Sequence, residues 1–187
     1  MTSLCRRLGS RAALVATLAC LPAVTTGRAP GADPEPQRLV DRVPAGQPVP
    51  SPLTFTTSFE RVVVVRLTYG SDVLEGLTRA VREERIESAV ILTGIGSLKS
   101  YHVHSVGRVE LPNTNVFFTG EGPYDLTAVN GYVVGGRVHA HVTFSDDKKA
   151  LGGHLEPGTT TYTFVIVTLG VLPASVDLSR VDDADWR

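Results

Sequence analysis

The sequence contains few residues that could form a thiolate metal site or a disulfide. Its 187 residues include two cysteines, Cys5 and Cys20, and both lie close to the N-terminus. If a leader is removed from this end, the rest of the chain has neither a disulfide nor a thiolate ligand. Any transition metal held by the rest of the chain must therefore be bound by histidine and oxygen atoms.

Three widespread motifs of nucleotide-binding proteins and hydrolases are also missing. Gly94 and Gly96 resemble part of a dinucleotide fingerprint, but the third glycine is absent, and strands are expected to follow where a βαβ unit would be needed. The sequence has no Walker A pattern and no G-x-S-x-G elbow. These absences argue against dinucleotide-binding, P-loop and α/β-hydrolase functions.

Positive charge is scarce outside the first residues. Four of the eighteen Lys and Arg residues precede Ala29, and no acidic residue does. Fourteen cations and nineteen anions then remain, a net charge of −5. Nucleic-acid binding depends on neutralising phosphates, so this balance does not favour a nucleic-acid partner.

The N-terminal residues have the pattern of a secretory signal peptide, predicted over residues 1–29. A basic head precedes the apolar run from Ala12 to Val24, which is too short to span a bilayer as a helix. We therefore expect an exported protein, periplasmic or extracellular. Residues 17–20 loosely resemble a lipobox, so a lipid anchor at Cys20 is one alternative; a disordered N-terminus or a misassigned start codon is another.

Composition divides the rest of the chain into three parts. Residues 30–52 contain seven prolines and are predicted to form an extended linker. Residues 53–175 are predicted to form the globular domain, and residues 176–187 an acidic, peripheral tail.

The hydrophobic pattern of the domain predicts an α+β fold, a mainly antiparallel β-sheet of about seven strands with one principal helix. The helix is expected to follow Ser71 as its N-cap and to run to about Arg85, because apolar residues recur there at helical spacing. A strand at 61–69 carries an apolar run that indicates burial on both faces, and one at 89–96 should turn at its glycines. Further strands are expected at 99–106, 114–119, 124–134, 137–145, 150–155 and 160–169.

The most informative pattern is a pair of strands that carries three histidines. Alternation over residues 138–144 predicts a strand with His139 and His141 on one face. A turn at 145–149 leads to a second strand, and a two-residue or a four-residue loop gives the same register. In that register His154 lies opposite His141, so three imidazoles share one face while apolar residues pair on the other.

Three convergent imidazoles suit a borderline-soft divalent cation, and zinc with an open fourth position is the usual result. The sequence thus predicts a metal site at His139, His141 and His154, with zinc or another divalent metal as the cofactor. Gly152 and Gly153 support this interpretation, since their missing side chains leave room for a ligand. The alternative is a row of half-exposed strand histidines that pack on their neighbours below a subunit interface.

Other polar residues are weaker candidates. His102 and His104 form a second H-x-H on a strand, but local pairing gives them no third ligand, so we expect them at the surface or in an interface. The hairpin register places Glu156 opposite His139, where its carboxylate could orient the metal-binding ring. Glu121 and Asp125 are expected to be solvated turn residues.

Four segments occur in the order expected for one known family. They are LTGIGS at 92–97, GEGPYDLTAVNG at 120–131, the strand with His139 and His141, and GGHLEPG at 152–158. From about residue 61 to residue 172 the chain resembles the PPC domain family, small α+β domains of plants and prokaryotes that are related in fold to acetolactate decarboxylase-like proteins.

The resemblance implies both an assembly and a site. The family's fold is an antiparallel sheet with one helix, assembled as a homotrimer with crevices between subunits. Prokaryotic members carry a metal, expected to be zinc, on histidines that match His139, His141 and His154. The resemblance therefore implies a homotrimeric zinc-binding domain. Three protein ligands leave one coordination position free, so our first hypothesis is that the ion holds a small anionic ligand in an inter-subunit crevice.

Two other functions are suggested by related proteins. In acetolactate decarboxylase, similarly placed histidines hold a zinc ion that polarises a keto acid, so a zinc-dependent lyase acting on a small keto acid is one alternative. No specific acid–base partner is identified in the sequence, and whether the chain is an enzyme stays open. Plant members bind AT-rich DNA through a basic AT-hook before the domain, but this chain has no Arg-Gly-Arg-Pro element, which disfavours DNA binding.

Overall fold

The structure is a computed structural model that describes residue 43 and residues 46–181. The predicted signal peptide at 1–29, the alternative lipid anchor at Cys20 and most of the linker at 30–52 lie outside the described residues, as do residues 182–187 of the tail. None of the helices in the described part is long and apolar enough to cross a membrane.

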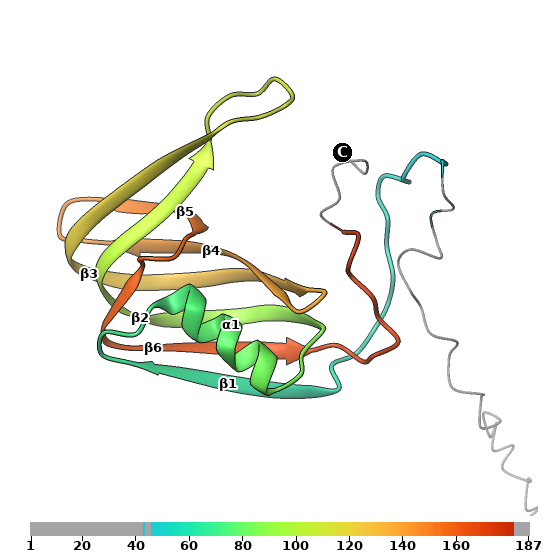
Figure 1. The fold of residues 1–187 in the computed structure, drawn as a ribbon, viewed down its shortest axis with the longest axis horizontal. Coiled ribbons are helices and arrows are strands. Elements are labelled where there is room, and N and C mark those ends of the chain that lie inside the picture. The colour runs from blue at the N-terminus through green and yellow to red at the C-terminus, as the bar shows by residue number, and fades with distance from the viewer. Residues whose placement is uncertain (1–42, 44–45, 182–187) are drawn as a thin grey trace, which may run out of the picture. The chain divides into compact units, whose positions relative to one another are not determined.

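The described domain consists of six strands and one helix (Figure 1). The helix, α1, spans Val73–Glu83. The strands are β1 (Arg61–Thr68), β2 (Ser88–Val106), β3 (Asn115–Val134), β4 (Arg137–Ser145), β5 (Ala150–Leu155) and β6 (Thr160–Val171). The predicted α+β class, a mainly antiparallel sheet with one principal helix, is confirmed.

The sheet has six strands, not about seven, because two pairs of predicted strands are continuous. The strands expected at 89–96 and 99–106 join as β2, and those at 114–119 and 124–134 join as β3. Gly96 lies at the first junction, where a Cβ atom would be 2.2 Å from the carbonyl oxygen of Phe164 on β6. This glycine therefore lets two backbones approach closely and does not end the strand.

The strands pair antiparallel in the order β1-β6-β2-β3-β4-β5. β5 also pairs with the C-terminal part of β2, so β2, β3, β4 and β5 close into a ring. Figure 1 shows α1 lying along one side of the sheet, and the connection between β2 and β3 projecting beyond the other elements. The ring brings residues of strands far apart in the sequence side by side.

The N-cap of α1 is Asp72, not the predicted Ser71. The Oδ1 atom of Asp72 accepts a hydrogen bond from the backbone N–H of Glu75 at 2.9 Å. Its Oδ2 atom accepts another from the N–H of Gly158 at 2.5 Å, which ties α1 to the loop after β5. The helix ends before the predicted Arg85, because that residue has a φ of 54°, outside the helical region.

The hydrophobic core lies between α1 and the sheet. Val73, Leu77 and Val81 of α1 are at most 2% exposed and pack against buried residues of the strands. Phe144 on β4 has the largest fully buried side chain among the described residues. Burial of these apolar surfaces is the main force that holds the strands in this arrangement.

The opposite surface of the sheet carries exposed apolar side chains. The prediction that β1 is buried on both faces is wrong, since Val65 and Leu67 are buried whereas Val62 and Val64 are 56% and 64% exposed. The reason is that α1 covers only one face of the sheet. We call the uncovered surface the outer apolar face; it consists of Val62, Val64, Ile95, Tyr132 and Phe164.

Candidate metal centre

The three predicted histidines come from the hairpin of β4 and β5. His141 pairs with His154 across the two strands, which confirms the predicted register. His139 lies two residues before His141 on β4 and therefore on the same face. The alternate residues of β4 face the core and are buried: Ala140, Val142 and Phe144.

The three imidazole rings lie close together on one face of the hairpin. The ring centroids of His139 and His141 are 5.6 Å apart, those of His139 and His154 4.9 Å, and those of His141 and His154 5.3 Å. With a metal–nitrogen distance of about 2.1 Å, two rings on a tetrahedral ion have centroids about 5.2 Å apart. The plane of His154 is inclined at 78° to that of His139 and at 77° to that of His141, so the rings do not stack.

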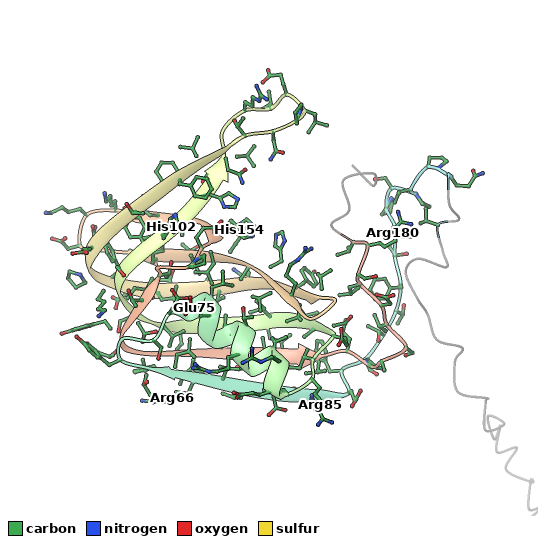
Figure 2. The ribbon with its side chains drawn as sticks, viewed as in Figure 1. Arg66, Glu75, Arg85, His102, His154 and Arg180 are labelled. Carbon is green, nitrogen blue, oxygen red and sulfur yellow. The ribbon has the colours of Figure 1, made fainter. Side chains whose placement is uncertain are left out.

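The centre lies on the solvent side of the sheet. His141 is exposed, and His139 and His154 are half-buried. Figure 2 shows His154 near His102, at the end of the sheet from which the β2–β3 connection projects. The Nδ1 atom of His154 is buried and makes no hydrogen bond. An ion bound by these rings would have space on its solvent side for a further ligand.

His104 lies beside this centre, although local pairing in the sequence gave it no third ligand. β2 pairs with β5 so that His104 lies opposite His154, and its side chain is only 15% exposed. A single cross-strand row therefore runs over the four strands of the ring: Phe117, His104, His154, His141 and Asn130. The pairing of β2 with β5 joins residues fifty positions apart, so no local pattern in the sequence could have indicated it.

Ring orientation distinguishes His104 from the other three histidines. The rings of His104 and His154 are stacked, with centroids 4.5 Å apart and planes inclined at only 19°. The lone pair of an imidazole nitrogen lies in the ring plane, so two stacked rings cannot both direct a lone pair at one ion between them. Among the described residues, the group whose ligand atoms all lie within 4.8 Å of one another is His104, His154 and Glu156, and His139 and His141 are not in it. The carboxylate of Glu156, which lies beside both rings, accounts for that closeness.

Glu156 contacts His104, not the predicted His139. Its Oε1 atom accepts a hydrogen bond from Nδ1 of His104 at 2.6 Å and lies 3.6 Å from Nδ1 of His154. The predicted position failed because β5 ends at Leu155 and the chain then turns toward β2. There the backbone N–H of Glu156 donates to the carbonyl oxygen of His102 at 3.0 Å.

The other candidate residues make their contacts with groups other than the three histidines. Nδ1 of His102 is 2.7 Å from the carbonyl oxygen of Pro157, and its ring lies 5.7 Å from that of Phe117. Glu121 lines a cavity of about 700 Å³, and Asp125 lines a neighbouring one of about 780 Å³; neither lining includes a histidine. Neither carboxylate is therefore placed to assist chemistry at the histidines.

Burial and the neighbouring imidazoles lower the pKa of two of the clustered histidines, His141 and His154. Burial lowers the pKa of His141 below its ordinary value of 6.5, and the neighbouring His139 and His104 lower it further. Burial also lowers the pKa of His154, as do His104, His139 and His141, while Glu156 acts in the opposite direction. Neutral imidazole is the form that binds a metal, so these shifts prepare both rings for coordination at neutral pH.

One curated relative shares part of the chain. The bifunctional protein GlmU of Synechococcus sp. (strain JA-3-3Ab) is 29% identical over 126 residues, which are 67% of this chain and 19% of that protein. This chain thus spans about a fifth of the relative's length.

Two solved structures are similar over most of the domain. A hypothetical protein from Salmonella enterica has a TM-score of 0.57 and 26% identity, covering 64% of this chain and 83% of that one. The plant- and prokaryote-conserved (PPC) protein of Pyrococcus horikoshii has a TM-score of 0.56 and 25% identity, covering 65% and 85%.

The family comparison agrees with these structures. The Plants and Prokaryotes Conserved (PCC) domain matches residues 55–173, which include every strand and the helix described above. The matched range contains the four segments on which the resemblance was based. The chain belongs to the Plants and Prokaryotes Conserved domain family.

Proposed function

We propose that this chain is an exported, homotrimeric metal-binding domain. It holds one divalent ion on His139, His141 and His154, with zinc preferred over other metals. The observation that carries the proposal is the set of ring separations of 4.9 to 5.6 Å. The signal-peptide pattern at residues 1–29 supports an exported location.

The chemistry of the site follows from its donors. Three neutral imidazoles leave a positive ion uncompensated and one coordination position open, which favours an anionic oxygen ligand such as a small carboxylate. The bound ion would supply Lewis acidity to that ligand. The chain's part is to hold the three rings on two paired strands, whose backbone hydrogen bonds fix their spacing.

Metal analysis tests the proposal directly. Protein purified without chelator is expected to contain about one equivalent of metal per chain, and His141→Ala to contain little, because two imidazoles rarely hold zinc against buffer. His102→Ala is the matched control and should keep its metal, since that ring hydrogen-bonds to Pro157 instead. Cobalt(II)-loaded protein should change its visible spectrum when acetate, lactate or pyruvate is added, as these fill the open position.

Equal metal content in the wild type and His141→Ala would contradict the site. If the visible spectrum of the cobalt(II)-loaded protein stays the same after each of the three acids is added, the ligand class alone would be contradicted.

The outer apolar face supports self-association. Val64 is 64% exposed and Ile95 53% exposed, and exposed apolar surface of this kind marks interaction sites. Tyr132 continues the face to the metal centre, because it lies opposite His139 on the paired strand. A copy packed on this face would thus reach the histidines and form a crevice beside them; the number of three subunits comes from the family resemblance.

Light scattering tests the assembly. The wild type is expected to have about three times the molar mass of the 20.0 kDa chain. Val64→Lys and Ile95→Lys should each lower the mass toward that of one chain, since a buried unpaired charge costs several kcal/mol. Val109→Lys is the control, because Val109 is 94% exposed on the β2–β3 connection. A wild type with the mass of one chain would contradict the trimer.

A further inference from the structure

Two residues beyond the three histidines, His104 and Glu156, lie beside the candidate metal centre, and one carboxylate oxygen lies near both His104 and His154. Oε1 of Glu156 is 2.6 Å from Nδ1 of His104 and 3.6 Å from Nδ1 of His154. The carboxylate accepts a hydrogen bond from Nδ1 of His104, while the Nδ1 atom of His154 is buried without a hydrogen bond. A buried imidazole nitrogen without a partner is rare in folded proteins and calls for an explanation.

The position of Glu156 is fixed by the backbone around it. Its N–H donates to the carbonyl oxygen of His102 at 3.0 Å. The hydroxyl of the buried Thr159 donates to the same carbonyl at 2.9 Å and accepts from the N–H of His102 at 3.0 Å. The carboxylate of Asp72 accepts a hydrogen bond from the N–H of Gly158, which lies between Glu156 and Thr159 in the sequence. Hydrogen bonds to β2 and to the N-cap of α1 therefore fix the loop that carries the Glu156 carboxylate.

We propose that Glu156 is a positioning residue of the metal centre, which orients His154 by accepting its Nδ1–H, and that His104 supports this carboxylate without binding the ion. The inference rests on the proposed function and adds two residues, Glu156 and His104, that lie against its ligand His154. It assigns the Nδ1 atom of His154 to Glu156 and leaves Nε2 as the atom that binds the ion.

Two observations carry the assignment. Metal-binding histidines almost always donate their second ring N–H to a carboxylate or carbonyl, and Glu156 is the carboxylate 3.6 Å from the free nitrogen of His154. The stacked planes of His104 and His154 exclude a shared ion, yet stacking holds the His154 ring in place on one side. His104 thereby fixes both the carboxylate and the ring, and its own nitrogen is satisfied by Glu156.

Three variants of the full chain test these roles. Glu156→Gln is expected to weaken zinc affinity by about 10- to 100-fold, measured by competition with a chromophoric chelator, because it removes the acceptor of the Nδ1 proton. Glu156→Asp should recover part of that loss. His104→Phe preserves a flat ring against His154 but removes the hydrogen bond to Glu156. It is therefore expected to weaken zinc affinity by no more than Glu156→Gln does, and its cobalt(II) spectrum should show the same number of nitrogen ligands as the wild type, since the ion loses no ligand.

Controls separate these roles from a general loss of structure. Glu121→Gln alters a carboxylate that lines another cavity and should leave zinc affinity unchanged. Thermal unfolding of the metal-free variants shows whether each still folds, and the cobalt(II) spectrum reports coordination in those that do.

Each outcome decides between defined alternatives. Unchanged affinity in Glu156→Gln, with metal bound by the wild type, overturns the positioning role while leaving the proposed function intact. A cobalt(II) spectrum of folded His104→Phe that has lost a nitrogen ligand, or a loss of affinity far beyond that of Glu156→Gln, shows that His104 is a ligand and overturns the assignment of its role. A wild type without metal overturns this inference and the proposed function together.

Discussion

His154→Ala is expected to lower zinc affinity by about a thousandfold or more while leaving the fold in place. His154 is the only one of the three proposed ligands on β5, and it lies between His104 and His141 in the cross-strand row. Structural zinc sites bind with about 10–16 kcal/mol in total, so loss of one ligand removes about 4 kcal/mol, or about three orders of magnitude. Competition with a chelator of known affinity measures the change.

The metal-free His154→Ala variant should be nearly as stable as the metal-free wild type at pH 8. The substitution removes a buried nitrogen that has no hydrogen bond, which offsets the packing lost with the ring. Below pH 6.5 the two proteins should diverge. The fold lowers the pKa of His154, so the unfolded chain binds a proton there before the folded chain does. Wild-type stability therefore falls as the pH drops through 6.5, and the variant lacks this contribution.

Urea unfolding of the metal-free proteins at pH 8 and pH 5.5 provides the comparison. His141→Ala is a useful second variant, because the pKa of His141 is also lowered and its pH dependence should become shallower in the same way. A His154→Ala protein that is several kcal/mol less stable than the wild type at pH 8 would mean that the His154 ring contributes mainly to the packing of the fold.

Local patterns in the sequence were sufficient to predict the hairpin that carries His139, His141 and His154. The turn at 145–149, the alternation on β4 and the register of His141 with His154 all depend on residues within about twenty positions of one another. Such pairings are determined by loop length and by the two-residue period of a strand, both of which can be read from a single sequence.

The outer part of the centre depends on long-range pairing and could not be predicted. His104 reaches His154 because β2 pairs with β5, and Glu156 reaches His104 because the chain leaves β5 after Leu155. Gly96 was expected to end a strand, but β6 approaches so closely at that position that a side chain there would clash with the β6 backbone. In each case the deciding contact comes from a segment more than forty residues away in the sequence.

Phe144→Ala is expected to destabilise the protein by about 3–5 kcal/mol, the usual cost of removing a fully buried phenylalanine. Phe144 is inaccessible to solvent, and its ring lies 4.7 Å from that of Tyr101 on β2 and 5.5 Å from that of Tyr124 on β3. The alanine would leave a cavity where three strands of the ring meet. Urea unfolding monitored by circular dichroism measures the free energy difference.

The same substitution connects the core to the metal centre. Phe144 is three residues from His141 on the opposite face of β4, so loosening β4 against β2 and β3 also loosens the rings on the outer side. We therefore expect a smaller loss of zinc affinity in Phe144→Ala, about tenfold, because a misplaced ligand is weakened but not removed. Phe144→Leu is the matched control, since it keeps most of the apolar volume and should lose less on both counts. If Phe144→Ala were as stable as the wild type, the packing of β4 against β2 and β3 could not be what holds the histidine strands in register.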